Sequence, residues 1–324
     1  MIKLHPVMFD VSVRVPATIA NLGPGFDALG LAVSLYCDAR AVAADADSFV
    51  YNGDAGIFGV DNLMHSGWRE AYQALGMTAP QVQLSCQNQI PLARGLGSSS
   101  AALVAGAALA DAVQGGRLGR SGVLRLCAAL EGHPDNVAPA VLGGFTASVM
   151  SSIAQLSTGL HSTRLHSTEL RSAQFDLPPE IAVLVSVPDY ELKTSEARDA
   201  LPQLYSRADM VFNLSRSALW VAAVASKDFS LLKEACRDRV HQPYRARFVQ
   251  NLEQTIEEAL NAGALAAFLN GAGPSVGALV EDASRAAVTA VLENFAPRVL
   301  HLTSSAGYSL TSSAGVDLLP SGVA

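Results

Sequence analysis

The chain has 324 residues, of which 50% are hydrophobic and 16% are charged. This length and apolar content are enough to bury a large core, so they exclude a mainly disordered chain. The net charge of −7 and the isoelectric point near 5.5 argue against a general nucleic-acid-binding protein, because such proteins carry a basic surface. A small anionic ligand remains compatible with this charge, since it needs only a local cluster of donors.

The four cysteines, Cys37, Cys86, Cys127 and Cys236, are widely spaced and form no CxxC pair. We therefore expect four separate core thiols in a reducing compartment, and no zinc site. No long apolar segment follows the single lysine of the first 15 residues, and no apolar run reaches the length of a membrane span. The sequence predicts a soluble, cytoplasmic protein.

The chain begins with alternating strand and helix patterns. Apolar and polar residues alternate over residues 10–17 and again over 81–87, which predicts two half-buried strands. Between them, residues 61–76 are expected to form a helix with Asp61 or Asn62 as its N-cap.

The middle of the chain suggests where two halves are joined. Residues 121–132 are expected to form a helix capped by Ser121. Residues 148–177 are rich in Ser, Thr and other polar residues, so we expect them to cross from one half to the other. The expected domains are residues 1–155 and 156–324.

The second half again mixes strands and helices. Residues 181–188 are expected to form a buried strand, and residues 208–226 and 248–263 to form helices. Residues 264–280 indicate a strand, a glycine loop and a second strand, whereas residues 304–324 are weakly patterned. Because there is no regular alternation of strand and helix, the expected fold class is α+β.

The loop that begins at Pro91 joins two glycines and three consecutive serines to a run of small apolar residues. The first N–H groups of a helix are unpaired and carry a partial positive charge, so a helix starting here would attract phosphate. Gly95 and Gly97 would let the backbone approach the anion. A Walker loop fits less well because no Lys-Ser or Lys-Thr follows, and Ser100 replaces the third glycine of a dinucleotide motif. A flexible loop that caps a core helix is the alternative.

Three segments together resemble the GHMP kinases, and within them the homoserine kinases. The string PLARGLGSSSAA is similar to the family's phosphate loop, residues 13–33 to the N-terminal motif of homoserine kinases, and residues 269–280 to the third, glycine-rich motif. The resemblance implies the GHMP kinase fold, with an N-terminal domain like domain 2 of ribosomal protein S5 and a C-terminal ferredoxin-like α/β sandwich. The implied ATP-binding residues are Pro91, Leu92, Ala93, Arg94, Gly95, Leu96, Gly97, Ser98, Ser99, Ser100 and Ala101.

The resemblance also implies where the chemistry takes place. Glu131 is the implied Mg²⁺ ligand, together with either Ser99 or Ser100. His133 and Asn136 are implied to face the substrate and its acceptor hydroxyl, although the string HPDN by itself is also typical of a turn. Asp135 is either a base or has no such role, since homoserine kinases are thought to work chiefly by positioning and charge stabilisation. The implied catalytic residues are Glu131, His133, Asn136 and Arg245.

The implied substrate is L-homoserine, a zwitterion that needs acceptors for its ammonium and donors for its carboxylate. Asp27 is the expected ammonium partner, and Arg198 and Arg245 are expected to hold the carboxylate. The expected substrate-binding residues are Asn21, Asp27, His133, Thr194, Arg198, Arg245, Gly271 and Gly273. A homodimer is expected because family members are often dimers.

The expected reaction is the ATP-dependent phosphorylation of the L-homoserine hydroxyl to O-phospho-L-homoserine, a step of threonine biosynthesis. One alternative is a GHMP kinase that acts on another small alcohol. A second is a catalytically silent protein of this fold that binds a ligand and signals to a partner. Glu131 and the loop serines are present, which favours the enzyme.

Overall fold

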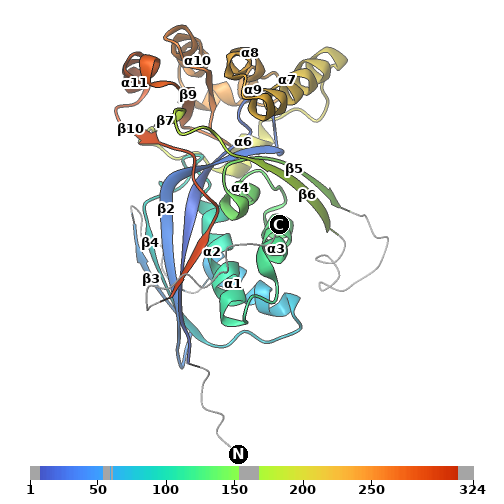
Figure 1. Ribbon diagram of the computed structural model, residues 1–324, viewed down its shortest axis with the longest axis vertical. Helices are drawn as coiled ribbons and strands as arrows, with labels where there is room; N and C mark the ends of the chain where they lie inside the picture. Colours follow the sequence, from blue (N-terminus) through green and yellow to red (C-terminus); the bar gives the residue numbers. More distant parts are fainter. Residues whose placement is uncertain (1–7, 54–58, 60, 153–167, 313–324) are drawn as a thin grey trace, which may run out of the picture.

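The structure, a computed structural model, describes residues 8–53, 59, 61–152 and 168–312, and these form two stacked lobes (Figure 1). The sheet of the first lobe consists of β1 (Asp10–Ala20), β2 (Leu29–Ala43), β3 (Ser48–Asn52), β4 (Val82–Asn88), β5 (Phe145–Ser152), β6 (Thr168–Phe175) and β11 (Ser309–Ser312). The helices of this lobe are α1 (Leu63–Ala74), α2 (Ser98–Val113), α3 (Gly119–Glu131) and α4 (Val137–Leu142).

The second lobe has a four-stranded antiparallel sheet in the order β10-β7-β9-β8. The sheet consists of β7 (Ala182–Ser186), β8 (Ala266–Leu269), β9 (Val276–Val280) and β10 (Val299–Leu302). Its helices are α6 (Thr194–Asp199), α7 (Arg207–Ser226), α8 (Leu232–Ala235), α9 (Gln242–Arg245), α10 (Leu252–Asn261) and α11 (Asp282–Phe295), with the 3₁₀ turns η2 (Phe229–Leu231) and η3 (Ala246–Phe248).

In the first lobe the sheet curves around the helices (Figure 1). Five strands lie in the order β11-β1-β2-β4-β3. β5 pairs with the first residues of β2, Leu29–Leu31, and with β6. The predicted strands at 10–17 and 81–87 are confirmed as parts of β1 and β4. The small residues of α2 let this helix lie against β1, α1 and α3 with most of its residues buried. This buried helix fixes the loop at its N-terminus.

The two predicted helices of this lobe are confirmed, and one of the caps differs. Asn62 caps α1 by accepting a hydrogen bond from the His65 N–H at 3.0 Å, as expected. Ser121 does not cap α3, because that helix begins two residues earlier, at Gly119. The carboxylate of Asp111 accepts hydrogen bonds from the N–H groups of Leu118 and Gly119 instead, so α2 supplies the cap of α3.

The expectation that residues 148–177 cross between the halves is wrong at both ends of that segment. β5 and β6 pair with each other in the first sheet, with Ser152 opposite Thr168, while residues 153–167 lie outside the described residues. The polar composition reflects a two-stranded edge with one exposed face. The division at residue 155 remains a prediction, but β6 and β11 follow it in sequence and belong to the first sheet.

The elements expected in the second half are present as β7, α7, β8 and β9. The helix expected over 248–263 begins only at Leu252, after a 3₁₀ turn and a left-handed Asn251. The weakly patterned end contributes β11, whose Val11↔Ser312 to Arg14↔Ser309 register covers the edge of β1. Residues 313–324 lie outside the described part. None of the described helices is long and apolar enough to cross a membrane.

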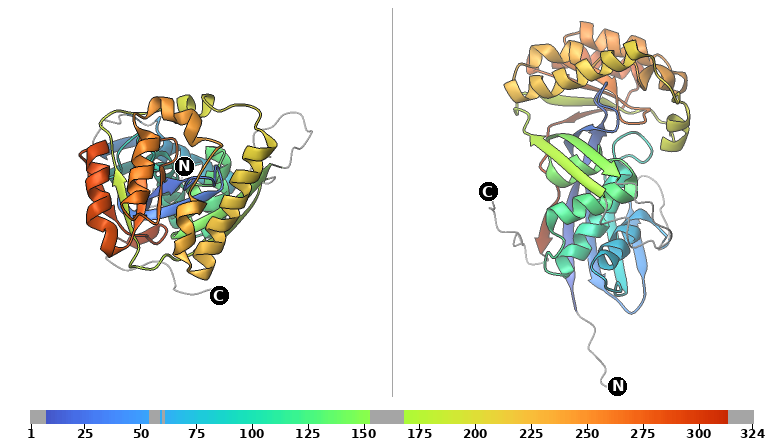
Figure 2. Two further views of the ribbon diagram at one scale, coloured as in Figure 1. Left: turned by 90° about the horizontal axis from the view of Figure 1, so that it is seen from above. Right: turned by 90° about the vertical axis from the view of Figure 1, so that its right-hand side faces the viewer.

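The side view in Figure 2 shows the two lobes stacked on each other, and the phosphate loop of the first lobe contacts the second. The Arg94 guanidinium donates to the Pro188 carbonyl at 2.8 Å and to the Asp189 carbonyl at 2.7 Å. A Cβ on Gly95 would lie 2.2 Å from the carbonyl oxygen of Asn270, so the glycine-rich turn after β8 packs directly against the phosphate loop. A cleft between the lobes is therefore bordered by segments of both.

Candidate active site

The N-terminus of α2 opens into the main cavity of the described structure, which has a volume of about 440 Å³. Gly97 precedes the helix in the left-handed conformation, with φ = 68°. A Cβ at Gly97 would lie 1.9 Å from Thr18 Oγ1, so this position accepts only glycine. No side chain caps α2 and its first turn has no acidic residue. Its first N–H groups are thus left for an anion.

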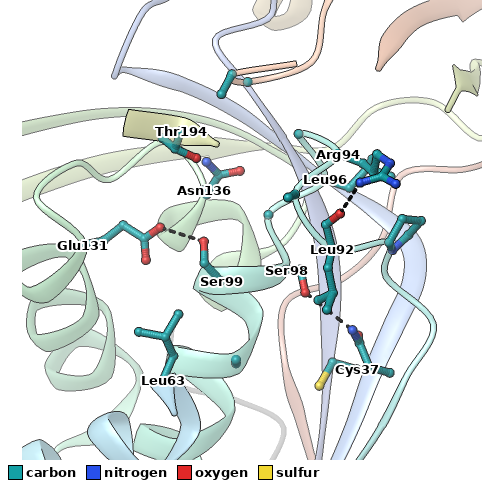
Figure 3. Close-up of a pocket in the computed structure, with 18 of the residues that line it drawn as sticks. Cys37, Leu63, Leu92, Arg94, Leu96, Ser98, Ser99, Glu131, Asn136 and Thr194 are labelled. Atoms are coloured by element: carbon teal, nitrogen blue, oxygen red, sulfur yellow. Dashed lines mark hydrogen bonds between the residues drawn. The ribbon is translucent and has the colours of Figure 1, made fainter. Parts of the chain in front are cut away.

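Glu131 faces the same helix turn. Its Oε1 accepts hydrogen bonds from Ser99 Oγ at 3.1 Å and from Ser100 Oγ at 2.9 Å. Figure 3 shows Glu131 and Ser99 directed toward each other across the cavity wall. Carboxylate and hydroxyl oxygens are the donors that Mg²⁺ prefers, so the three residues predicted as metal ligands lie together. Ser99 lines the cavity, whereas Ser100 is fully buried.

The cavity has an apolar end that the sequence did not predict. β3 contributes Phe49 and Tyr51, and the start of α1 contributes Leu63 and Met64. Further along the wall, Asn88 donates hydrogen bonds to the Ile90 carbonyl at 2.9 Å and to Tyr51 Oη at 3.0 Å. These are ordinary core-type residues, and only their common position beside the phosphate loop marks them. An apolar wall with a few polar groups beside it is typical of a small-molecule site.

At the other end, Asp27 and Arg198 form an ion pair with each other. Arg198 donates two hydrogen bonds, of 2.9 and 2.8 Å, to the two carboxylate oxygens of Asp27. Asn21 supports Asp27 by accepting a hydrogen bond from its backbone N–H at 3.1 Å. The sequence predicted these residues as separate ligands for opposite charges of one substrate. The structure brings them together in the cavity wall and pairs them with each other.

Arg245 lies beside this pair and is 2% exposed. It donates hydrogen bonds to the carbonyl oxygens of Gly271 at 2.8 Å and Ala197 at 3.2 Å, and lies 3.2 Å from His241 Nδ1. Within the described structure no carboxylate forms an ion pair with it. Burial, followed by the neighbouring Arg198 charge, lowers the pKa of Arg245 to about 10. A ligand carboxylate would relieve this cost.

His133 and Asp135 form a hydrogen-bonded pair between the charged end and Glu131. His133 Nδ1 lies 2.6 Å from Asp135 Oδ1, and Asp135 is buried. Burial acts to lower the pKa of His133, but the hydrogen bond and charge of Asp135, with the charges of Asp27 and Glu131, raise it overall. The Asp135 carboxylate therefore favours the protonated form of the His133 ring.

The remaining predicted residues lie around the same cavity. Asn136 accepts a hydrogen bond from Thr18 Oγ1 at 2.8 Å, and Thr194 lines the cavity at the start of α6. Gly271 also lines it, and its carbonyl accepts a 3.1 Å hydrogen bond from Asn21. Of the predicted residues, Ser100, Ala101 and Gly273 are not in the lining. The roles of all these residues remain predictions.

Comparison with known proteins identifies the family. The model of the GHMP kinases N terminal domain matches residues 62–144, and that of the GHMP kinases C terminal matches residues 220–297. A homoserine kinase of Thermus thermophilus is 48% identical over 281 residues, or 87% of this chain and 90% of that protein. A homoserine kinase of Desulfitobacterium hafniense is 43% identical over 84% of this chain and 88% of its own length.

The fold comparison agrees with the sequence comparison. The crystal structure of homoserine kinase from Cytophaga hutchinsonii has a TM-score of 0.78 at 21% identity, covering 96% of this chain and 100% of that one. The predicted GHMP kinase fold is thus confirmed. The chain belongs to the GHMP kinase family, and within it to the homoserine kinases.

Proposed function

We propose that this protein transfers the γ-phosphoryl group of ATP to the side-chain hydroxyl of L-homoserine, giving ADP and O-phospho-L-homoserine for threonine biosynthesis. One observation carries the proposal. A single cavity contains a helix N-terminus suited to phosphate and, at its far end, the charges of Asp27, Arg198 and Arg245. That combination fits an amino acid held beside a triphosphate.

The phosphate loop would hold the triphosphate through the free N–H groups of α2 and the Ser98 and Ser99 hydroxyls. Glu131, with either Ser99 or Ser100, would hold Mg²⁺, which neutralises charge on the transferring phosphoryl group, and the position of Ser99 in the cavity lining favours Ser99. The apolar end beyond the loop would take the adenine. These assignments orient the phosphate chain toward the charged end of the cavity.

The charged end would hold the zwitterion by exchanging partners. The substrate ammonium would bind Asp27, and the substrate carboxylate would bind the two arginines. The internal pair of Asp27 with Arg198 would then be replaced by two substrate ion pairs, and Arg245 would gain the counter-charge that it lacks. Mevalonate has a carboxylate but no ammonium, so it would leave Asp27 without a partner.

His133 and Asn136 would orient the acceptor hydroxyl. Because Asp135 raises the pKa of His133, the protonated ring, which donates a hydrogen bond, is favoured over the neutral ring that could remove a proton. Asp135 is occupied by this hydrogen bond, which supports positioning and charge stabilisation over catalysis by a side-chain base.

The test is ADP release with Mg-ATP and a panel of L-homoserine, D-homoserine, L-serine, L-threonine and mevalonate. We expect strong activity with L-homoserine alone. Activity confined to another alcohol would keep the kinase and refute the zwitterion site. ATP binding without turnover of any compound would instead favour the silent sensor. Light scattering checks the expected homodimer, whose mass would be twice 33.7 kDa.

A further inference from the structure

Two of the four cysteines lie side by side, contrary to the expectation of four separate thiols. Cys37 on β2 and Cys86 on β4 have their Sγ atoms 3.0 Å apart. In the antiparallel register Cys37 is opposite Asn88 and Ala39 is opposite Cys86, so the two cysteines are diagonal neighbours on one face of the sheet. They are 49 residues apart in sequence, so no local pattern predicts that they are in contact.

Both thiols belong to the wall of the active-site cavity. Cys37 and Cys86 are 2% and 6% exposed, and both line the cavity beside the apolar end. Figure 3 shows Cys37 on the wall close to Ser98 and Leu92. The other two cysteines, Cys127 and Cys236, are buried outside the cavity lining. A small reagent inside the cavity would therefore meet this pair and neither of the others.

The two thiols share one hydrogen bond, which either sulfur can donate. That hydrogen bond, together with burial, raises the pKa of Cys37 well above its ordinary value. The nucleophile is a thiolate rather than a thiol, and oxidation can begin at either sulfur.

We propose that Cys37 and Cys86 are a dithiol site that a hydroperoxide oxidises to a reversible disulfide, and that bound nucleotide shields it. One thiol loses its proton, and its thiolate attacks one oxygen of hydrogen peroxide; the O–O bond breaks, a sulfenic acid forms, and the departing hydroxide takes up that proton as the first water. The sulfur of the other cysteine then attacks the sulfenic sulfur, the S–O bond breaks, and the hydroxyl leaves with the second thiol proton as the second water. Two thiols lose two electrons and two protons, and one hydrogen peroxide becomes two waters.

The sheet geometry allows this bond. A disulfide has sulfurs about 2.05 Å apart, so the pair must close by about 1 Å. Diagonal cross-strand positions are about 7–8 Å apart, slightly more than the usual Cα separation across a disulfide, so β2 and β4 must also shift a little toward each other as the bond closes. The reverse reaction needs only an external dithiol, because each sulfur leaves by thiol–disulfide exchange.

The experiment treats the purified full-length protein with hydrogen peroxide, with and without Mg-ADP at about 100 times its Kd. We expect the intact mass to fall by about 2 Da, the two hydrogens lost per disulfide. Trypsin should then release residues 15–40 linked to 70–94 until dithiothreitol is added. Because only about 1% of the protein is then free, Mg-ADP should slow the reaction about 100-fold. Cys37→Ser and Cys86→Ser should each abolish the link, whereas the matched control Cys127→Ser should retain it.

Each outcome bears on a separate part of the inference. Oxidation without the 15–40 to 70–94 link, or a link that survives in Cys86→Ser, would overturn the dithiol site. The protection arm rests on the proposed nucleotide binding, so Mg-ADP binding is measured in parallel by calorimetry. A link that forms equally fast while Mg-ADP is bound would overturn the shielding. Failure of Mg-ADP to bind would refute the proposed function and leave the link standing.

Discussion

Replacing Arg245 with methionine should weaken both the binding of the substrate carboxylate and the stability of the fold. The pKa of about 10, against 12.5 for an ordinary arginine, is a difference of 2.5 units. At about 1.4 kcal/mol per unit, removing the buried charge recovers roughly 3 kcal/mol of folding free energy. The variant also loses hydrogen bonds to Ala197, His241 and Gly271, at about 1.5–3 kcal/mol each because the donor is charged. This loss exceeds the recovered desolvation cost, so the free energy of unfolding should fall by about 1–6 kcal/mol.

Binding of the substrate carboxylate has no such compensation. A hydrogen bond to a charged group contributes about 1.5–3 kcal/mol, so kcat/KM for L-homoserine should fall roughly 10- to 150-fold in Arg245→Met. Most of the loss should appear in KM for L-homoserine, with KM for ATP nearly unchanged. The exposed Arg247 on the next turn provides the matched control, Arg247→Met.

The assay combines urea denaturation with steady-state kinetics on both variants. An Arg245→Met protein that loses several kcal/mol of stability while KM for L-homoserine stays constant would refute the reasoning. Arg245 would then be a structural residue whose hydrogen bonds outweigh its burial.

Three further predictions concern the rest of the site. Glu131→Gln should raise the Mg²⁺ concentration needed for half-maximal activity at least about tenfold, checked by Mg²⁺ titration, because a carboxylate ligand to the ion is lost. Gly97→Ala should abolish ATP binding, measured by calorimetry, because the added Cβ would collide with Thr18. The control Gly116→Ala has a similar φ of 75° but open space around the added Cβ, so its free energy of unfolding in urea should fall by only about 1–2 kcal/mol. His133 has a raised pKa, so its stabilisation is complete below about pH 6.5 and is lost as pH rises through the folded-state pKa. Unfolding free energies from pH 5 to 9 should therefore fall more steeply above pH 6.5 than in His133→Gln, and parallel curves would contradict this.

Much of the phosphate-binding part of the site was predictable, because local chemistry determines it. Glycine, serine and a following helix are contiguous around Gly97, and Glu131 stands in a distinctive string. The apolar end was not predictable, because Phe49 and Leu63 differ from core residues only in where the sheet and α1 place them. The Cys37–Cys86 contact likewise depends on the pairing register of β2 and β4, which no local pattern specifies.

The fold shows the same division. Buried strands and amphipathic helices were found because their periodicity is local, as in β7 and α1. The β5–β6 pair was misjudged because an exposed two-stranded edge has the polar composition of a linker. The predicted start of α10 was wrong because Asn251 takes a left-handed conformation that the neighbouring residues in the sequence do not indicate.

The pairing of β11 with β1 has a consequence for how the protein is made. Val11 emerges from the ribosome about 300 residues before its partner Ser312. At synthesis rates of about 5–20 residues per second, that interval is about 15–60 s. During this time the outer edge of β1 is exposed in the nascent chain and open to pairing with other chains. The first lobe therefore becomes complete only after the second lobe has been translated, so the order of synthesis leaves the β1 edge unpaired for most of that time.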